Sequence, residues 1–322
     1  MRWSGDLEAS GRAAGVSREG EPKTVFAARG DGLKVAYEVV GPPDGFPVVL
    51  MHGMPGSRLG PRPRGIALHR HGVRLVCYDR PGYGKSERRE GRDVADAARD
   101  VEAIANHLNL PPFAIVGRSG GGPHALACAA DPDLRSRITS VAVLVSFAPS
   151  DKPELDWYAG MNADNVRGFG REAPDTAAIE AEIRGRAAIA AQNPHLLMQH
   201  LQGQMTDMDR RVVSQFGLRR TIVDAYREAL RNGPFGWVDD VLALGRSWKF
   251  ELDSIDTDLT QVQIWHGEHD TFAPVGHAEW LAGAIRGAQF KLRRGAAHFD
   301  AMEELPQVLA GLSRGARAIT VG

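Results

Sequence analysis

Short apolar segments of strand length alternate with segments of helical periodicity along most of this chain, and this alternation limits the folds open to it. After an N-terminal hairpin that turns at Asp31-Gly32, we expect strands at residues 48–53, 73–79, 113–117, 141–148, 262–270 and 289–295. Buried strands that alternate with helices form parallel sheets with helices on both faces. The sequence therefore predicts an α/β fold with a mostly parallel, doubly wound sheet.

The alternation stops near residue 150 and resumes near residue 257. The intervening residues form helical segments without a convincing strand, and a gap of roughly a hundred residues exceeds ordinary loop length. We therefore expect an all-helical cap at 150–256, inserted into a core domain made of 23–149 and 257–322. Residues 1–22 are rich in Gly, Ser, Arg and Glu, so we expect a flexible N-terminal tail there.

Composition and charge argue against several kinds of partner. The 39 Lys and Arg residues nearly balance the 40 Asp and Glu residues, so no excess charge favours nucleic acid or an anionic membrane. No segment is apolar over the length that crosses a bilayer, and the N-terminal segment lacks the apolar core of a signal peptide. Cys77 and Cys128 lie in apolar segments and are expected to be free thiols. We therefore expect a cytoplasmic protein that acts on a small molecule, in an oligomeric state that the sequence leaves open.

A serine lies at the sharp transition from the expected strand 113–117 to an expected helix at 121–130. Residues 117–121 read GRSGG and fit the pattern G-x-S-x-G between a strand and a helix. A strand that turns directly into a helix crowds the positions two before and two after the serine, so small residues are needed there. The N-terminus of the helix directs backbone N–H groups toward developing negative charge. This arrangement predicts that Ser119 is a nucleophile.

A serine nucleophile needs a base, and the base needs an acid that orients it. His298 follows the last expected strand, and Asp270 follows the strand before it. Both therefore lie at the sheet edge where open α/β proteins carry their sites. Asp300 is a rival acid, but its place at the start of a helix favours a role as N-cap.

Several motifs together resemble the α/β-hydrolase fold family, in its serine-nucleophile, capped form. The resemblance runs from about Thr24 to Leu312. It is carried by HGMPGS at 52–57, DRPGYGKS at 79–86, GRSGG at 117–121, HGEHD at 266–270 and AAHF at 296–299.

The resemblance implies a role for each catalytic group. Ser119 would be the nucleophile, Asp270 the acid and His298 the base, with the helical insertion covering them. The family pattern also implies an oxyanion hole built from the backbone N–H groups of Met54 and Gly120. HGEHD also resembles a set of metal ligands, but its spacing matches no strong zinc pattern. We expect neither a metal nor a cofactor.

The expected reaction is hydrolysis of a small carboxylic ester or lactone through an acyl-enzyme intermediate. A serine at this position counts against dehalogenase and epoxide-hydrolase chemistry, which uses an aspartate nucleophile in this family. Hydrolysis of a carbon–carbon bond by the same triad stays open. An aminopeptidase similar to proline iminopeptidases is another alternative, although those enzymes carry tryptophan where this chain has Gly120. A receptor that retains the triad and binds a ligand is a third.

Five residues are candidates for contact with the substrate. We expect Arg118 to form a structural ion pair beneath the cap, and the alternative is that it binds a substrate carboxylate through two hydrogen bonds. An apolar pocket suited to a modest-sized ligand is expected under the cap. Its aromatic candidates are Trp157, Phe235, Trp237 and Trp248.

Overall fold

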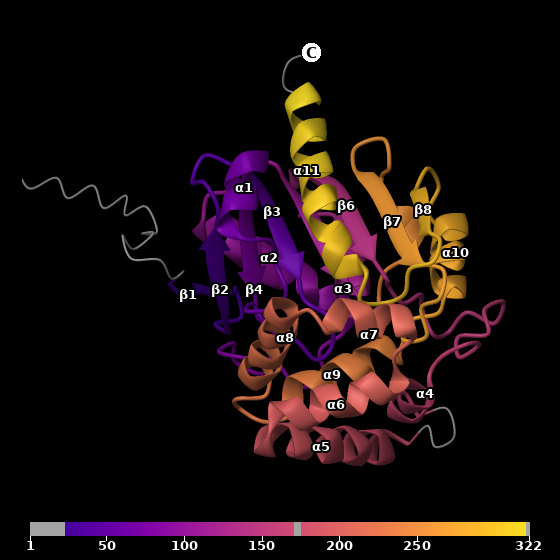
Figure 1. Cartoon of the computed structure of the whole chain (residues 1–322). Helices are drawn as coiled ribbons and strands as arrows, with labels where there is room; N and C mark the ends of the chain where they lie inside the picture. Colours follow the sequence, from indigo (N-terminus) through magenta and orange to yellow (C-terminus); the bar gives the residue numbers. More distant parts are fainter. Residues whose placement is uncertain (1–22, 171–174, 320–322) are drawn as a thin grey trace, which may run out of the picture.

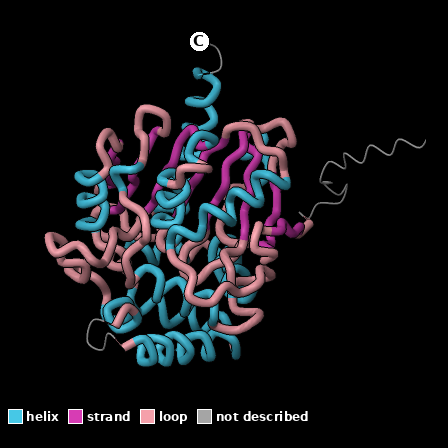
Figure 2. Tube along the Cα trace, turned by 180° about the vertical axis from the view of Figure 1, so that it is seen from behind, coloured by secondary structure: helices cyan, strands magenta, loops and turns pink. Residues whose placement is uncertain are grey.

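A twisted sheet forms the centre of the protein, and helices cover both of its faces (Figures 1 and 2). The computed structural model describes residues 23–170 and 175–319, with side chains up to residue 315, so the predicted tail at 1–22 lies outside the described residues. The strands are β1 (Val25–Ala28), β2 (Lys34–Val40), β3 (Phe46–Met51), β4 (Val73–Tyr78), β5 (Phe113–Arg118), β6 (Ile138–Leu144), β7 (Gln261–Gly267) and β8 (Gln289–Arg293). They form one eight-stranded sheet in the order β1-β2-β4-β3-β5-β6-β7-β8. Because β2 alone is antiparallel to its neighbours, the predicted mostly parallel α/β fold is confirmed.

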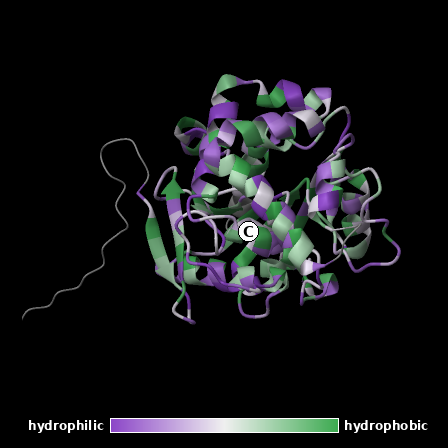
Figure 3. Cartoon of the chain, turned by 90° about the horizontal axis from the view of Figure 1, so that it is seen from below, coloured by the Kyte–Doolittle hydropathy of each residue, from purple (hydrophilic) through white to green (hydrophobic). Residues whose placement is uncertain are grey.

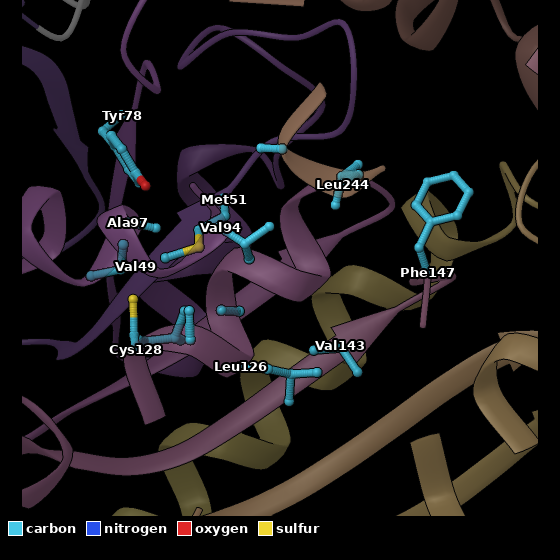
Figure 4. Packing of buried hydrophobic residues seen from close by; sticks show 14 of the residues in the cluster. Val49, Met51, Tyr78, Val94, Ala97, Leu126, Cys128, Val143, Phe147 and Leu244 are labelled. Atoms are coloured by element: carbon cyan, nitrogen blue, oxygen red, sulfur yellow. The ribbon is translucent and has the colours of Figure 1, made fainter. Parts of the chain in front are cut away.

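The strands are apolar on both faces because each face packs against helices. Helices α1 (Gly65–His71) and α11 (Ala301–Ile319) cover one face, where Val48 and Leu50 of β3 are buried. The opposite face holds Val49 and Met51, which lie in the cluster shown in Figure 4. It is covered by α2 (Ala97–His107), which follows the 3₁₀ turn Val94–Asp96, and by α3 (Gly121–Ala130) and α10 (Val275–Ala284). Two-sided burial explains the near-continuous apolar runs of the central strands. Cys77 and Cys128 are buried free thiols, as expected.

Strand β6 lies about three residues before its predicted position. We expected residues 141–148, whereas the strand covers Ile138–Leu144. Val145 has a φ of 47°, which ends the extended conformation. The apolar run continues because the following loop is part of the core, where Phe147 stacks on Trp157 with ring centroids 5.5 Å apart. The chain therefore stays buried after Leu144 although it no longer pairs as a strand.

Helices occupy the long insertion between β6 and β7, and we call α4 to α9 the cap. They are α4 (Ala163–Gly168), α5 (Thr176–Gln192), α6 (Pro194–Gln204), α7 (Asp207–Val213), α8 (Phe216–Ala229) and α9 (Phe235–Leu244). Side-chain N-caps fix where four of them begin, namely Asn162, Asp175, Asn193 and Thr206. In Figure 1 the cap lies across the carboxyl ends of the parallel strands, and Figure 3 shows hydrophilic and hydrophobic residues mixed along its helices. None of the described helices has the length and hydrophobicity needed to cross a membrane.

A buried cluster of charges fastens α9 of the cap to the core. Asp240 accepts hydrogen bonds from Arg80 at 2.6 Å, from Arg92 at 2.5 Å and from the Tyr83 hydroxyl at 2.9 Å. Burial alone would raise the pKa of Asp240, but Arg80 and Arg92 hold it well below its ordinary value. The carboxylate is therefore ionised and shared between two guanidinium groups.

Two buried histidines make the stability of the fold sensitive to acid. Burial and the nearby Arg80 lower the pKa of His124 to about 3, and burial lowers the pKa of His277 to about 4. Both residues titrate near 6.5 in an unfolded chain, so below that pH the unfolded state binds more protons than the folded state. The free energy of unfolding is therefore expected to fall between about pH 6.5 and pH 4, by about 2 kcal/mol for each histidine near pH 5.

Urea unfolding near pH 7 and near pH 5 measures this change. His124→Asn keeps a donor for the Gly120 carbonyl, which His124 Nδ1 contacts at 2.8 Å, and removes the titrating group. This variant should lose about 2 kcal/mol less than the wild type between the two pH values. Equal unfolding free energies of the wild type at both pH values would contradict the expectation.

Candidate active site

Ser119 occupies a strained turn between β5 and α3. Its φ is 52°, a left-handed conformation that is uncommon outside glycine. The turn is held by two backbone hydrogen bonds, from Ser119 N–H to the Leu144 carbonyl at 2.9 Å and from Gly122 N–H to the Ser119 carbonyl at 2.8 Å. The strand and the helix thus fix the serine at the carboxyl edge of the sheet.

The glycines around Ser119 are required by the backbone that approaches them. A Cβ atom on Gly117 would lie 2.4 Å from the Gly121 carbonyl oxygen. On Gly121 it would lie 2.6 Å from the carbonyl oxygens of both Met51 and His52. Real Cβ atoms do not approach backbone oxygens so closely. The spacing of small residues in G-x-S-x-G therefore has a steric cause in this protein.

The structure brings His298 and Asp270 into contact. His298 Nδ1 lies 2.7 Å from Asp270 Oδ2. The other oxygen of Asp270 accepts the backbone N–H groups of Phe272 at 2.8 Å and Ala273 at 2.9 Å, which fixes the carboxylate. The side chain of Asp300 instead accepts the Ala297 N–H at 2.8 Å. Of the two aspartates, Asp270 is thus the one in contact with the imidazole.

Ser119 and His298 line the same cavity, which has a volume of about 80 Å³. The structure shows no hydrogen bond between Ser119 Oγ and the imidazole among the described residues. Such contacts commonly tighten only when the substrate is in place. The cap closes the cavity with mostly apolar side chains, which include Leu197, Ile222, Tyr226, Trp237 and Val241.

The two expected oxyanion donors lie side by side. A Cβ atom on Gly120 would be 2.9 Å from Met54 Cβ and 3.7 Å from the Met54 backbone nitrogen. Neither N–H group donates to a backbone carbonyl of the described chain. Preceding Met54, His52 bonds the Gly53 carbonyl through Nδ1 at 2.7 Å and accepts the Arg80 N–H at 3.2 Å. Burial and Arg80 hold the pKa of His52 well below its ordinary value, so this imidazole is neutral.

Arg118 lines the cavity beside the nucleophile. Within the described chain its guanidinium makes neither a salt bridge nor a hydrogen bond, so the described residues supply no partner for the expected structural ion pair. Burial lowers its pKa to about 10, and this still leaves the group charged at neutral pH.

Of the four aromatic candidates, Trp237 lines the cavity and the other three lie elsewhere. Trp157 donates its indole N–H to the Ala148 carbonyl at 2.7 Å and packs in the core. Phe235 lies under the guanidinium groups of Arg88 and Arg184, 4.3 Å and 5.0 Å from them. Trp248 stacks on Phe250 with centroids 5.8 Å apart. These side chains serve packing, which sequence reasoning does not separate from substrate contact.

The HGEHD segment holds no cluster suited to a metal. His266 Nε2 contacts the Ala273 carbonyl at 2.7 Å, whereas the side chains of Glu268 and His269 are exposed. No group of three His, Cys, Asp or Glu side chains within the described residues is arranged to hold an ion.

The structure adds one residue that sequence reasoning missed. Asp209 of α7 is fully buried and accepts the backbone N–H of Phe299 at 2.7 Å. Phe299 directly follows His298, so a cap carboxylate fixes the loop that carries the imidazole. Burial raises the pKa of Asp209. No sequence signal marks this contact, because the partners are 90 positions apart and acidic residues are ordinary in a first helical turn.

Comparison with known proteins gives one family. Residues 47–305 match the family described as alpha/beta hydrolase fold. A proline iminopeptidase of Arabidopsis thaliana is 34% identical over 126 residues, which cover 38% of this chain and 32% of that protein. A non-heme chloroperoxidase of Streptomyces lividans is 35% identical over 120 residues, covering 37% of this chain and 43% of that protein. The chain thus spans less than half the length of these curated relatives.

Solved structures agree over nearly the whole chain. A thermophilic esterase from Thermogutta terrifontis superposes with a TM-score of 0.62 over 92% of this chain and 99% of its own, at 20% identity. A bromoperoxidase from Bacillus anthracis gives 0.62 over 91% and 100%, at 21% identity. Such low identities establish the fold alone. Together with the match over 47–305, they show that this chain belongs to the α/β-hydrolase fold family.

Proposed function

We propose that the protein is a serine hydrolase that cleaves a small carboxylic ester or lactone. The observation that supports this most strongly is the shared cavity. Ser119, on its strained turn, and His298 both line this cavity. Nδ1 of His298 lies 2.7 Å from Asp270 Oδ2. An activated hydroxyl, a base and an orienting carboxylate are the parts that acyl transfer requires.

The proposed reaction has two steps. His298 takes the hydroxyl proton as Ser119 Oγ attacks the carbonyl carbon, and the N–H groups of Gly120 and Met54 stabilise the oxyanion. The imidazolium then gives its proton to the departing alkoxide oxygen, leaving an acyl-serine. A water molecule, deprotonated by His298, attacks the acyl-serine, and the proton returns to Ser119 as the carboxylic acid leaves.

The cavity favours an ester or lactone over the substrate of an aminopeptidase. Proline iminopeptidases are among the relatives of this chain, but a free substrate amine calls for a carboxylate partner. No Asp or Glu belongs to the described lining of the cavity. Of the acidic cap residues, Glu180 and Glu182 pair with Arg184 and Arg186. A bifunctional esterase/perhydrolase of Acinetobacter calcoaceticus, 32% identical over 121 residues, agrees with the ester assignment.

A fluorophosphonate probe and a substrate panel test the proposal. We expect covalent labelling of Ser119, located by peptide mass spectrometry, and multiple turnover of p-nitrophenyl acetate or butyrate. Lactones, diketones and prolyl amides in the same panel separate the alternative reactions. Binding of esters without turnover would instead indicate a receptor, and failure of both labelling and hydrolysis would contradict the proposal.

A further inference from the structure

We propose that the active-site cavity selects a substrate that carries a carboxylate group, and that Arg118 binds this group. This inference rests on the proposed function and deepens it by naming the substrate class. It takes up a cationic group that the catalytic mechanism leaves unused.

The position of Arg118 places its charge beside the reacting centre. A Cβ atom added to Gly53 would lie 3.4 Å from Ser119 Cβ and 3.5 Å from Arg118 Nη2. The guanidinium therefore reaches the Gly53–Met54 segment, next to an expected oxyanion donor. Arg118 keeps part of its surface accessible, and it borders the cavity that Ser119 and His298 line. A ligand that occupies this cavity can meet both the hydroxyl and the guanidinium.

Among the described residues the charge of Arg118 is uncompensated, whereas the other basic side chains at the cavity have acidic neighbours. Arg186 bonds Glu182 at 2.6 Å, and His200 lies 2.6 Å from Asp164. The electrostatic neighbour of Arg118 is Tyr226, whose pKa burial raises to about 12. This phenol is neutral at physiological pH and supplies no negative charge. The described lining thus presents one unpaired cation to the ligand.

The charge and geometry of a guanidinium indicate which ligand group would bind it. A cation that is unpaired and largely withdrawn from water is unfavourable, and an anionic partner with matching hydrogen-bond acceptors relieves that cost. A carboxylate accepts two parallel N–H groups from arginine, so it matches both the charge and the fork geometry. Because Ser119 Cβ and Arg118 Nη2 both lie within 3.5 Å of the same point beside Gly53, the carboxylate is expected only a few bonds from the scissile carbonyl. Short hemiesters of dicarboxylic acids and acetyl esters of small hydroxy acids meet this requirement.

Matched pairs of esters test the inference. The methyl hydrogen esters of succinate, glutarate and adipate differ from methyl butyrate, pentanoate and hexanoate by a carboxylate in place of a terminal methyl group. Acetoxypropionate and propyl acetate form the corresponding pair on the alcohol side. The quantity to measure, by pH-stat titration, is the ratio of kcat/KM for the anionic ester to kcat/KM for its neutral partner. We expect the wild type to prefer the anionic member of at least one pair.

Variants of two cavity arginines assign the preference. Arg118→Gln should lower the ratio roughly 30-fold or more, the usual effect of truncating one partner of a buried charge pair, mainly through KM. Arg118→Lys should retain part of the preference, because lysine keeps the positive charge but lacks the two parallel N–H donors of the guanidinium. Arg186→Gln is the matched control, since the charge of Arg186 is already paired with Glu182, and its ratio should stay at the wild-type value.

Each outcome bears on a separate statement. A wild type that is labelled at Ser119 and hydrolyses neutral esters without preferring anionic ones would overturn the inference and leave the proposed function standing. An Arg118→Gln variant that loses activity equally on both members of a pair would overturn it as well, because it would show a structural role. Absence of labelling and of all hydrolysis would overturn the proposed function itself. Should Arg118→Gln fail to fold, the wild-type preference and the Arg118→Lys ratio still decide.

Discussion

Ser119→Ala is expected to lower kcat for ester hydrolysis roughly 10⁶-fold, the scale at which removal of a serine nucleophile acts in enzymes that use a triad. Without the hydroxyl no acyl-serine forms, and the oxyanion donors and binding contacts leave only residual catalysis. The fold should be retained, because Ser119 makes its two turn-forming hydrogen bonds through the backbone. Initial rates with p-nitrophenyl butyrate, together with thermal unfolding, measure both effects.

Met54→Ala provides the comparison for this loss. The variant keeps the backbone N–H that is expected to bind the oxyanion and removes only the side chain, so its loss of kcat should be far smaller than that of Ser119→Ala. A Ser119→Ala protein with wild-type turnover would refute the assigned nucleophile. Equal losses in the two variants would show that Met54 acts through its side chain.

Asp240→Asn is expected to lower the free energy of unfolding by about 3–5 kcal/mol. The substitution keeps the size of the side chain and removes its charge, so the buried guanidinium groups of Arg80 and Arg92 lose the carboxylate that they share. An uncompensated charge in the interior costs far more than an intact pair contributes. Urea unfolding at neutral pH measures the loss.

A second aspartate shows whether burial is the cause. Asp207 lies on α7 and pairs with Arg210 at 2.9 Å, but its side chain is 96% exposed. Asp207→Asn should therefore change the unfolding free energy by no more than about 1 kcal/mol. If Asp240→Asn were as mild as Asp207→Asn, the buried cluster would not hold the cap to the core.

The parts of the site that follow from local sequence were predictable. The Gly-Arg-Ser-Gly-Gly turn is recognisable in the sequence because a backbone clash at Gly117 or Gly121 restricts these positions to the smallest residue. The approach of Asp270 to His298 followed from the rule that parallel strands end at one edge of a sheet. Apolar runs and periodicity likewise predicted which segments of the core are strands and which are helices, with β6 displaced by about three residues.

Contacts between distant residues that neither a motif nor the sheet edge brings together were not predictable. Arg80 and Asp240 are 160 positions apart, and no local pattern links them. The sequence likewise does not reveal that the described residues hold no partner for Arg118, because it shows which charges exist and not which of them lie in contact. An aromatic residue such as Trp157 looks the same in the sequence whether it packs in the core or faces a ligand.

Asp209 links the loop of His298 to helix α7 of the cap. Its side chain accepts a hydrogen bond from the Phe299 N–H, which joins α7 to the loop of His298. A displacement of α7 away from the sheet would break this bond and remove one of the contacts that hold the loop in place. The placement of the cap and the placement of the imidazole are thus coupled through one buried carboxylate.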